Sequence, residues 1–151
     1  MATTQKDIIN DLNHLISLNV DAIKGYGDAG NESDSGRLRV WMFNVAKERE
    51  HFKADLQSIV RAMGSEPEND GSFLGSLHRA WISIKGDATD ETNEEMLEEC
   101  IRGEEKAVED YEKVLRHNLT PNARTVVQGQ LDQIRNDLQK LRAMEELVDQ
   151  D

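Results

Sequence analysis

Four long stretches of this sequence repeat apolar residues at intervals of three and four, which is the period of an amphipathic α-helix. We expect long helices at residues 4–29, 35–63, 92–117 and 121–149, and a shorter one at 72–85. Polar or glycine-containing runs separate them, including a linker around Pro67. The pattern predicts an all-α four-helix bundle that forms a single domain over residues 1–151.

Residues that cap helices mark several of the predicted ends. Thr4 precedes the first helix, and Thr120 precedes a proline at the first position of the last helix. Thr92 and Glu95 have the spacing of a capping box and predict the start of the 92–117 helix. The glycines of the 25–30 run are expected to end the first helix.

The lengths of the connections predict the topology. Short loops join the first long helix to the second and the third to the fourth, so each pair should form an antiparallel hairpin. The connection between the second and third long helices has about 28 residues, enough to cross the length of a bundle as in ferritin-like folds. The alternative is an up-down-up-down bundle with the short helix docked at one end.

The strongly acidic composition limits the partners of this chain. The formal net charge is −12 and the pI is about 4.7, and such a surface repels nucleic acids and anionic membranes. We find no secretory signal and no apolar stretch of about 18 residues, so we expect a cytoplasmic protein. A single cysteine, Cys100, excludes an intrachain disulfide and fits a reducing compartment.

Two glutamates at the middle of predicted apolar seams are the candidate site residues. Glu48 belongs to a Glu-x-x-His tetrad with His51, and Glu104 lies on the third long helix. Ferritin-like dinuclear iron sites take a glutamate from each of two helices and a Glu-x-x-His from each of the other two. The 121–149 helix has no such tetrad, and its seam residues include Ile134 and Leu138. A complete di-iron centre is therefore not expected.

Three other interpretations of these glutamates remain open. Both side chains could lie at the rim of the seam and reach solvent. They could pair inside the protein with Arg49, Arg102 or His51, because burying bare carboxylates is costly. They could instead hold one metal ion in a residual mononuclear site made of Glu48, His51 and Glu104. Asn19, at the middle of the first helix, could share their layer.

The remaining titratable residues indicate structural roles. His14 and His117 are expected to face solvent, and Tyr26 and Tyr111 fall at core positions. Cys100 is expected to be a small buried hydrophobe. The sequence contains no nucleophile constellation and no phosphate-binding glycine loop, so no catalytic residue is assigned.

Three segments carry a resemblance to a known family. They are the 71–85 run Gly-Ser-Phe-Leu-Gly-Ser-Leu-His-Arg-Ala-Trp-Ile-Ser-Ile-Lys, the tetrapeptide ending at Pro67, and the Leu-Thr-Pro ending at Pro121. The chain resembles a bacterial ferritin-like family that is known as a domain of unknown function. This resemblance implies a ferritin-like four-helix bundle and no particular activity. Where that family tends to carry metal-ligand types, this chain has Ile23, Ile101 and Leu138.

These observations favour a non-enzymatic protein that acts through binding or assembly, for example in a stress response. No cofactor is expected. Some apolar residues are not needed for the apolar seams of the bundle and favour a homodimer; they are Trp41, Phe43 and Phe73. The first alternative is a protein that binds iron, manganese or zinc at the residual site, and the second is a di-iron oxidase or peroxidase.

Overall fold

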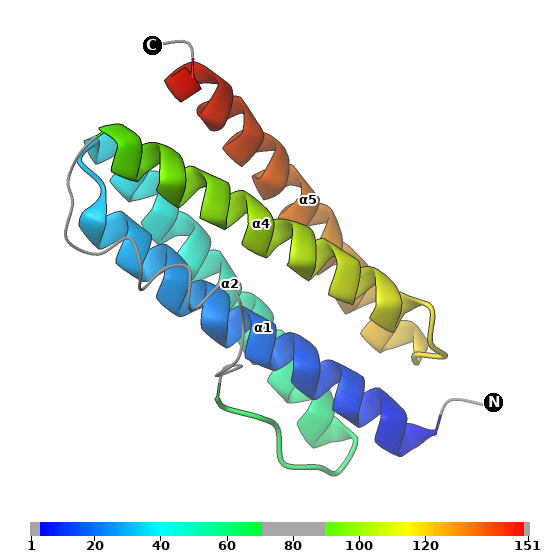
Figure 1. Cartoon of the computed structure of the whole chain (residues 1–151). Helices are drawn as coiled ribbons and strands as arrows, with labels where there is room; N and C mark the ends of the chain where they lie inside the picture. Colours follow the sequence, from blue (N-terminus) through cyan, green and yellow to red (C-terminus); the bar gives the residue numbers. More distant parts are fainter. Residues whose placement is uncertain (1–3, 71–89, 150–151) are drawn as a thin grey trace.

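The computed structural model describes residues 4–70 and 90–149, and within them the chain forms four helices and no strand. These are α1 (Gln5–Glu32), α2 (Gly36–Ala62), α4 (Asp90–Leu115) and α5 (Pro121–Asp149). Figure 1 shows α1 and α2 as one antiparallel hairpin and α4 and α5 as a second hairpin packed against it. The predicted all-α four-helix bundle is confirmed. The short helix predicted at 72–85 lies outside the described residues.

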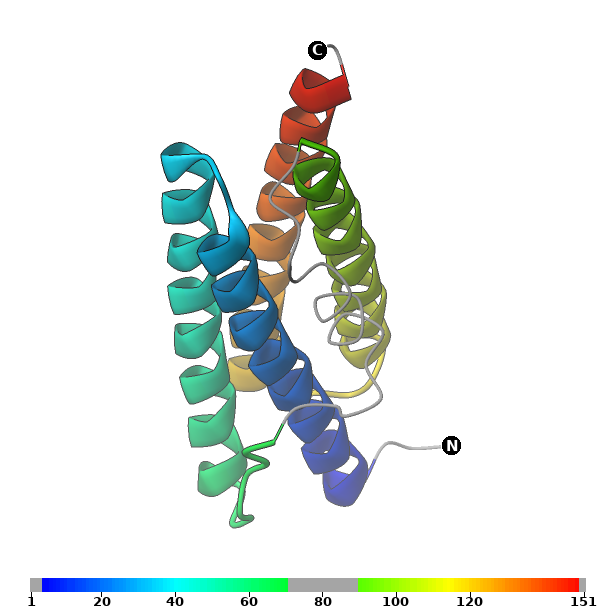
Figure 2. The ribbon, with the colours of Figure 1, turned by 60° about the vertical axis from the view of Figure 1, so that its left-hand side comes forward.

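The helices α2 and α4 run in the same direction. In Figures 1 and 2, α2 ends at the end of the bundle where α1 begins, and α4 begins at the opposite end. Hydrogen bonds agree, since the side-chain amide of Gln5, the first residue of α1, donates to the carbonyl of Met63 at the end of α2 at 3.1 Å. At the other end of α1, the hydroxyl of Ser33 lies 3.9 Å from the sulfur of Met96 in α4.

Three predicted helix ends are confirmed by their capping contacts. The hydroxyl of Thr4 accepts from the backbone N–H of Asp7, whose carboxylate accepts from the N–H of Thr4, both at 3.1 Å. The hydroxyl of Thr120 accepts from the N–H of Ala123 at 3.2 Å and so caps α5. Gly64, with a φ of 83°, ends α2 in the left-handed conformation that favours glycine.

Three helix boundaries differ from the predicted ones by two or three residues. The α1 helix continues through the 25–30 glycines to Glu32, because Gly30 serves close packing and does not end the helix. A Cβ atom on Gly30 would lie 2.5 Å from Cε1 of Phe43, so the glycine leaves room for the Phe43 ring of α2 to pack here. The α4 helix begins at Asp90, which places Thr92 in the first turn instead of at the cap, and it ends at Leu115.

A buried polar residue in each helix divides the core into two apolar clusters. One cluster includes Leu12, Leu56, Tyr111 and Leu131, and the other includes Tyr26, Met42, Cys100 and Leu141. Along each helix the passage from one cluster to the other falls at a polar residue, namely Asn19, Arg49, Glu104 and Asp137. The middle of the bundle is therefore a polar layer, and this layer contains the candidate site residues Glu48 and Glu104.

Candidate functional site

A fully buried arginine is at the centre of the polar layer. Arg49 of α2 is 1% exposed, and its two terminal nitrogens donate to the two carboxylate oxygens of Glu104 of α4, each at 2.8 Å. One of these nitrogens also donates to the carboxylate of Asp137 of α5 at 3.0 Å. Such a bidentate pair is among the stronger hydrogen-bonded arrangements in proteins. Arg49 thereby joins three of the four helices.

Glu48 lies at the solvent side of this cluster. Its carboxylate accepts from Nε of Arg49 at 3.3 Å, and its side chain is 24% exposed. Burial raises the pKa of Glu48 to about 8, and the hydrogen bond and charge of Asp137 add to the shift. At neutral pH Glu48 therefore holds a proton. The guanidinium group of Arg49 thus lies among the carboxyl groups of Glu48, Glu104 and Asp137.

Aromatic rings enclose the guanidinium group of Arg49. Its central carbon lies 5.6 Å from the ring centroid of Tyr26 and 5.6 Å from that of Phe52, distances at which cation–π attraction operates. The Tyr26 ring meets Trp41 edge to face, with centroids 6.2 Å apart. Burial alone lowers the pKa of Arg49, but the charge and hydrogen bonds of Glu104 outweigh burial and raise it. Arg49 is therefore a permanent buried cation.

A second hydrogen-bonded network lies beside the arginine cluster. The amide of Asn19 in α1 donates to the hydroxyl of Tyr111 in α4 at 2.8 Å, and this hydroxyl donates to Gln130 in α5 at 2.7 Å. The amide of Gln130 then donates to the carbonyl of Phe52 in α2 at 3.2 Å. Asn19 thus lies in the polar layer but bonds to Tyr111, not to Glu48 or Glu104.

The structure brings together two of the three predicted site residues, Glu48 and Glu104. Both contact Arg49, so the internal glutamate–arginine pair is confirmed, and the interpretation of Glu104 as a rim residue is wrong. His51 is exposed on α2, and no hydrogen bond or ion pair joins it to the cluster in the described chain. Within residues 4–70 and 90–149, no group of three or more His, Cys, Asp or Glu side chains is arranged to hold a metal ion. The metal site at Glu48, His51 and Glu104 stays a prediction.

Two polar residues of α5 were not identified from the sequence as part of the core. Asp137 and Gln130 of α5 are 3% and 4% exposed, and both bond into the polar layer. Each lies next to an apolar residue, Leu131 or Leu138. Because these leucines already complete the apolar pattern of a helix, the sequence offered no reason to place Gln130 and Asp137 in the core as well. A stripe three positions wide, which core-facing helices usually have, would have included both.

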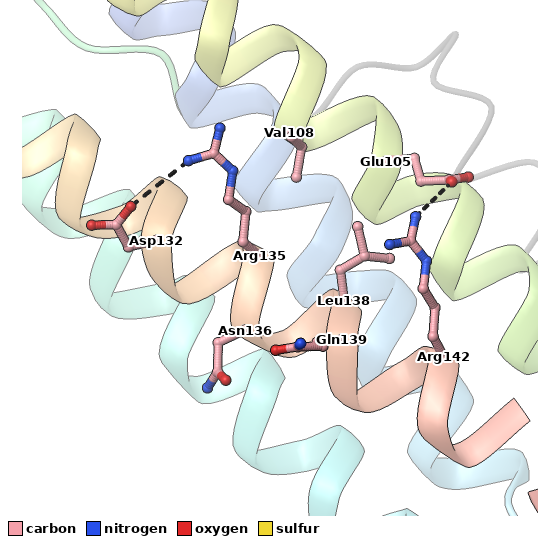
Figure 3. Close-up of a pocket in the computed structure, with 8 residues that line it drawn as sticks. All are labelled: Glu105, Val108, Asp132, Arg135, Asn136, Leu138, Gln139 and Arg142. Atoms are coloured by element: carbon pink, nitrogen blue, oxygen red, sulfur yellow. Dashed lines mark hydrogen bonds and ion pairs between the residues drawn. The ribbon is translucent and has the colours of Figure 1, made fainter. Parts of the chain in front are cut away.

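A surface pocket lies outside the arginine cluster, between α4 and α5. Figure 3 shows it, with a volume of about 620 Å³ and with Val108 and Leu138 among its lining residues. Its cations are already paired, since Arg142 donates to Glu105 at 2.9 Å and Arg135 donates to Glu112 at 3.1 Å. Nothing in this balanced lining selects a ligand. No helix within residues 4–70 and 90–149 combines the length and apolarity needed to cross a membrane.

The fold and its polar layer define an all-α four-helix bundle with a charged centre. The chain belongs to the family described as a domain of unknown function (DUF2383), whose model matches residues 7–117. The match ends before α5, so Asp137 and Gln130 lie beyond it. No curated protein matches the chain.

Two solved structures are similar in fold. One is a conserved hypothetical protein from Mycobacterium tuberculosis, at 14% identity and a TM-score of 0.74, with 93% of this chain and 99% of that chain covered. The other is a hypothetical protein from Pyrococcus furiosus, at 18% identity and a TM-score of 0.76, with 93% of this chain and 89% of that chain covered. At these identities the similarity concerns the fold alone.

Proposed function

We propose that this protein is a ferritin-like bundle without a complete di-iron centre, and that it acts by binding or assembly and not by catalysis. The observation that carries the proposal is the guanidinium group of Arg49 between the buried carboxylates of Glu104 and Asp137. In ferritin-like di-iron proteins, metal ions lie among carboxylates in the bundle core. Here an arginine supplies the positive charge. The parallel course of α2 and α4 supports the ferritin-like topology.

The energetics of burial support this role for Arg49. An uncompensated carboxylate in a protein interior is strongly unfavourable, and a well-bonded cation offsets the cost. Glu104 is 1% exposed, and each of its two carboxylate oxygens accepts a hydrogen bond from Arg49. A metal ion on Glu104 would have to displace these bonds and leave Arg49 buried without its main partner. The cluster therefore favours a structural role over metal chemistry.

The second candidate function is binding of one iron, manganese or zinc ion by Glu48, His51 and Glu104. One observation favours it: Glu48 reaches solvent in part and carries a proton that a cation could replace. His51 follows one helical turn after Glu48, and its exposed ring is open to solvent on α2.

Metal stoichiometry tests both candidates. The protein is purified without chelator, incubated anaerobically with iron(II), manganese(II) or zinc(II), desalted and measured by plasma mass spectrometry, beside a His51→Ala variant. We expect substoichiometric metal in both proteins and no iron(II)-dependent oxygen uptake. One ion per chain that the His51→Ala change removes would establish the mononuclear site. Two iron ions with oxygen uptake would contradict the proposal.

The assembly we propose is a homodimer formed through the outer face of α2. Val40 and Phe43, one turn apart on this helix, are 58% and 40% exposed. Of the other apolar residues expected at an interface, Trp41 packs on Tyr26, and Phe73 lies outside the described residues. Sedimentation velocity over a concentration series should show a dimer that a Val40→Ser/Phe43→Ser variant weakens. A wild-type protein that remains monomeric throughout would refute this assembly.

A further inference from the structure

A pocket between α1 and α4 collects cationic side chains on an otherwise acidic protein. It has a volume of about 440 Å³, and its lining includes Lys106, Lys113, Arg116 and the two histidines His14 and His117. The whole chain has 18 basic and 30 acidic residues, so a lining with more cationic than acidic side chains reverses the general balance. The lining contains two carboxylates, those of Asp11 and Asp110.

Both of these carboxylates are already paired with cationic or histidine side chains. Nζ of Lys106 donates to the two carboxylate oxygens of Asp110 at 3.0 and 3.1 Å, and Nε2 of His14 lies 2.9 Å from the same group. Asp11 contacts Nδ1 of His117. The two histidines were expected to face solvent and are about half exposed. Each also contacts an aspartate and so bridges α1 and the α4 side of the bundle.

The other cationic side chains of the pocket, those of Arg116 and Lys113, can still donate hydrogen bonds to a ligand. The guanidinium group of Arg116 makes no hydrogen bond or ion pair within the described chain, and its side chain is exposed. Among the described residues Lys113 pairs with Glu109 alone, at 3.1 Å, and both side chains are more than half exposed. Arg116 and Lys113 thus offer N–H groups at one cavity.

We propose that this pocket binds a phosphate group, with Arg116 and Lys113 as its main ligands. The planar fork of a guanidinium group matches the oxygens of a phosphate, and a lysine adds a point charge. His14 and His117 also line the cavity, so their rings can report binding of a ligand there. The site is separate from the arginine cluster. It extends the proposed binding function by naming a class of ligand, compounds that carry a phosphate group.

A competing account places these cations at the end of α4 only to stabilise its last turn, where positive charge is favourable. Arg61 provides a matched control, because it is an exposed arginine in the last turn of α2 and lies outside the pocket. Neither Arg116→Gln nor Arg61→Gln removes a side-chain hydrogen bond of the described chain, so both variants should fold as the wild type does.

The test is a titration of the full chain with inorganic phosphate, pyrophosphate and ADP, followed by calorimetry and by NMR of the histidine rings. Chloride at matched ionic strength corrects for screening. We expect saturable binding that moves the His14 and His117 signals and leaves that of His51 unchanged. Arg116→Gln should weaken binding by roughly threefold to tenfold, as for a partly exposed charge-assisted hydrogen bond, and Lys113→Gln should act in the same direction.

The three ligands distinguish the source of the phosphate group. Tighter binding of ADP than of pyrophosphate would support a phosphate ester as the ligand, and the reverse order would support a free oxyanion. Shifts no larger than those with chloride would overturn the proposal. An equal loss of affinity in Arg61→Gln and Arg116→Gln would also overturn it, because a general charge effect would then explain the binding.

Discussion

The guanidinium group of Arg49 and the carboxylate of Glu104 form a bidentate pair across the bundle, with both N–O distances at 2.8 Å and both side chains almost fully buried. Asp137 adds a third helix to this contact. Because the pair lies where the two apolar clusters of the core meet, it also fixes the register of α2 against α4. The stability of the bundle should therefore depend strongly on each partner.

Replacing Arg49 with methionine should destabilise the protein by about 3–5 kcal/mol, because Glu104 and Asp137 would remain buried without a positive charge. Urea unfolding of Arg49→Met and wild type measures the difference. Arg61→Met, an exposed change on the same helix, is the control and should stay within about 0.5 kcal/mol of wild type. A cost below about 1 kcal/mol for Arg49→Met would contradict the assigned role.

The raised pKa of Glu48 predicts that alkaline pH weakens the fold. Burial, reinforced by Asp137, raises this pKa from its ordinary 4.5 to about 8. Between these values the native protein keeps a proton that the unfolded chain releases, so the contribution of Glu48 is complete below pH 4.5 and is lost as the pH rises toward 8. Urea midpoints measured from pH 5 to pH 9 should fall in the wild type and fall less in Glu48→Gln. Parallel pH profiles of the two proteins would contradict the prediction.

The hydroxyl of Tyr111 links Asn19 to Gln130, so its removal should leave buried polar groups without a partner. We expect Tyr111→Phe to cost about 1–3 kcal/mol although it preserves the ring. Equilibrium unfolding measures this loss, and Tyr111→Phe combined with Asn19→Leu should cost less than the sum of the two single changes. Strict additivity would show that the network is not coupled.

Two glycines should respond to alanine in opposite directions. Gly64 has a φ of 83°, so Gly64→Ala should destabilise the protein by about 1–2 kcal/mol. Gly129 lies within α5 with no atom within 4 Å of an added Cβ, so Gly129→Ala should stabilise by about 0.5–1 kcal/mol. Thermal unfolding of both variants checks the pair. A stabilised Gly64→Ala protein would show that α2 does not require the left-handed conformation at its end.

The four helices of this chain could be predicted from the sequence, because they depend on local signals. The apolar period and caps such as Thr4 and Thr120 involve residues only a few positions apart. The centre of the bundle depends on contacts between residues far apart in sequence. Glu104 was identifiable as a carboxylate on an apolar seam, but its partner Arg49 is 55 residues away in the sequence. Asp137, which bonds to the same arginine, is 88 residues from it. Asp137 was not predicted as a core residue because the adjacent Leu138 fits the apolar pattern. The packing of α5 against α2 shows that Asp137 is the residue that bonds to Arg49.

The most direct test of the central claim, that Arg49 takes the place of a metal cation, is manganese(II) binding by the wild type and by Arg49→Met. Calorimetry under anaerobic conditions measures both proteins after circular dichroism has confirmed that each is folded. We predict no specific binding to the wild type, and about one ion per chain in the variant, whose carboxylates have the oxygen chemistry that manganese prefers. Equally tight binding to both proteins would show that the guanidinium group of Arg49 does not replace a metal.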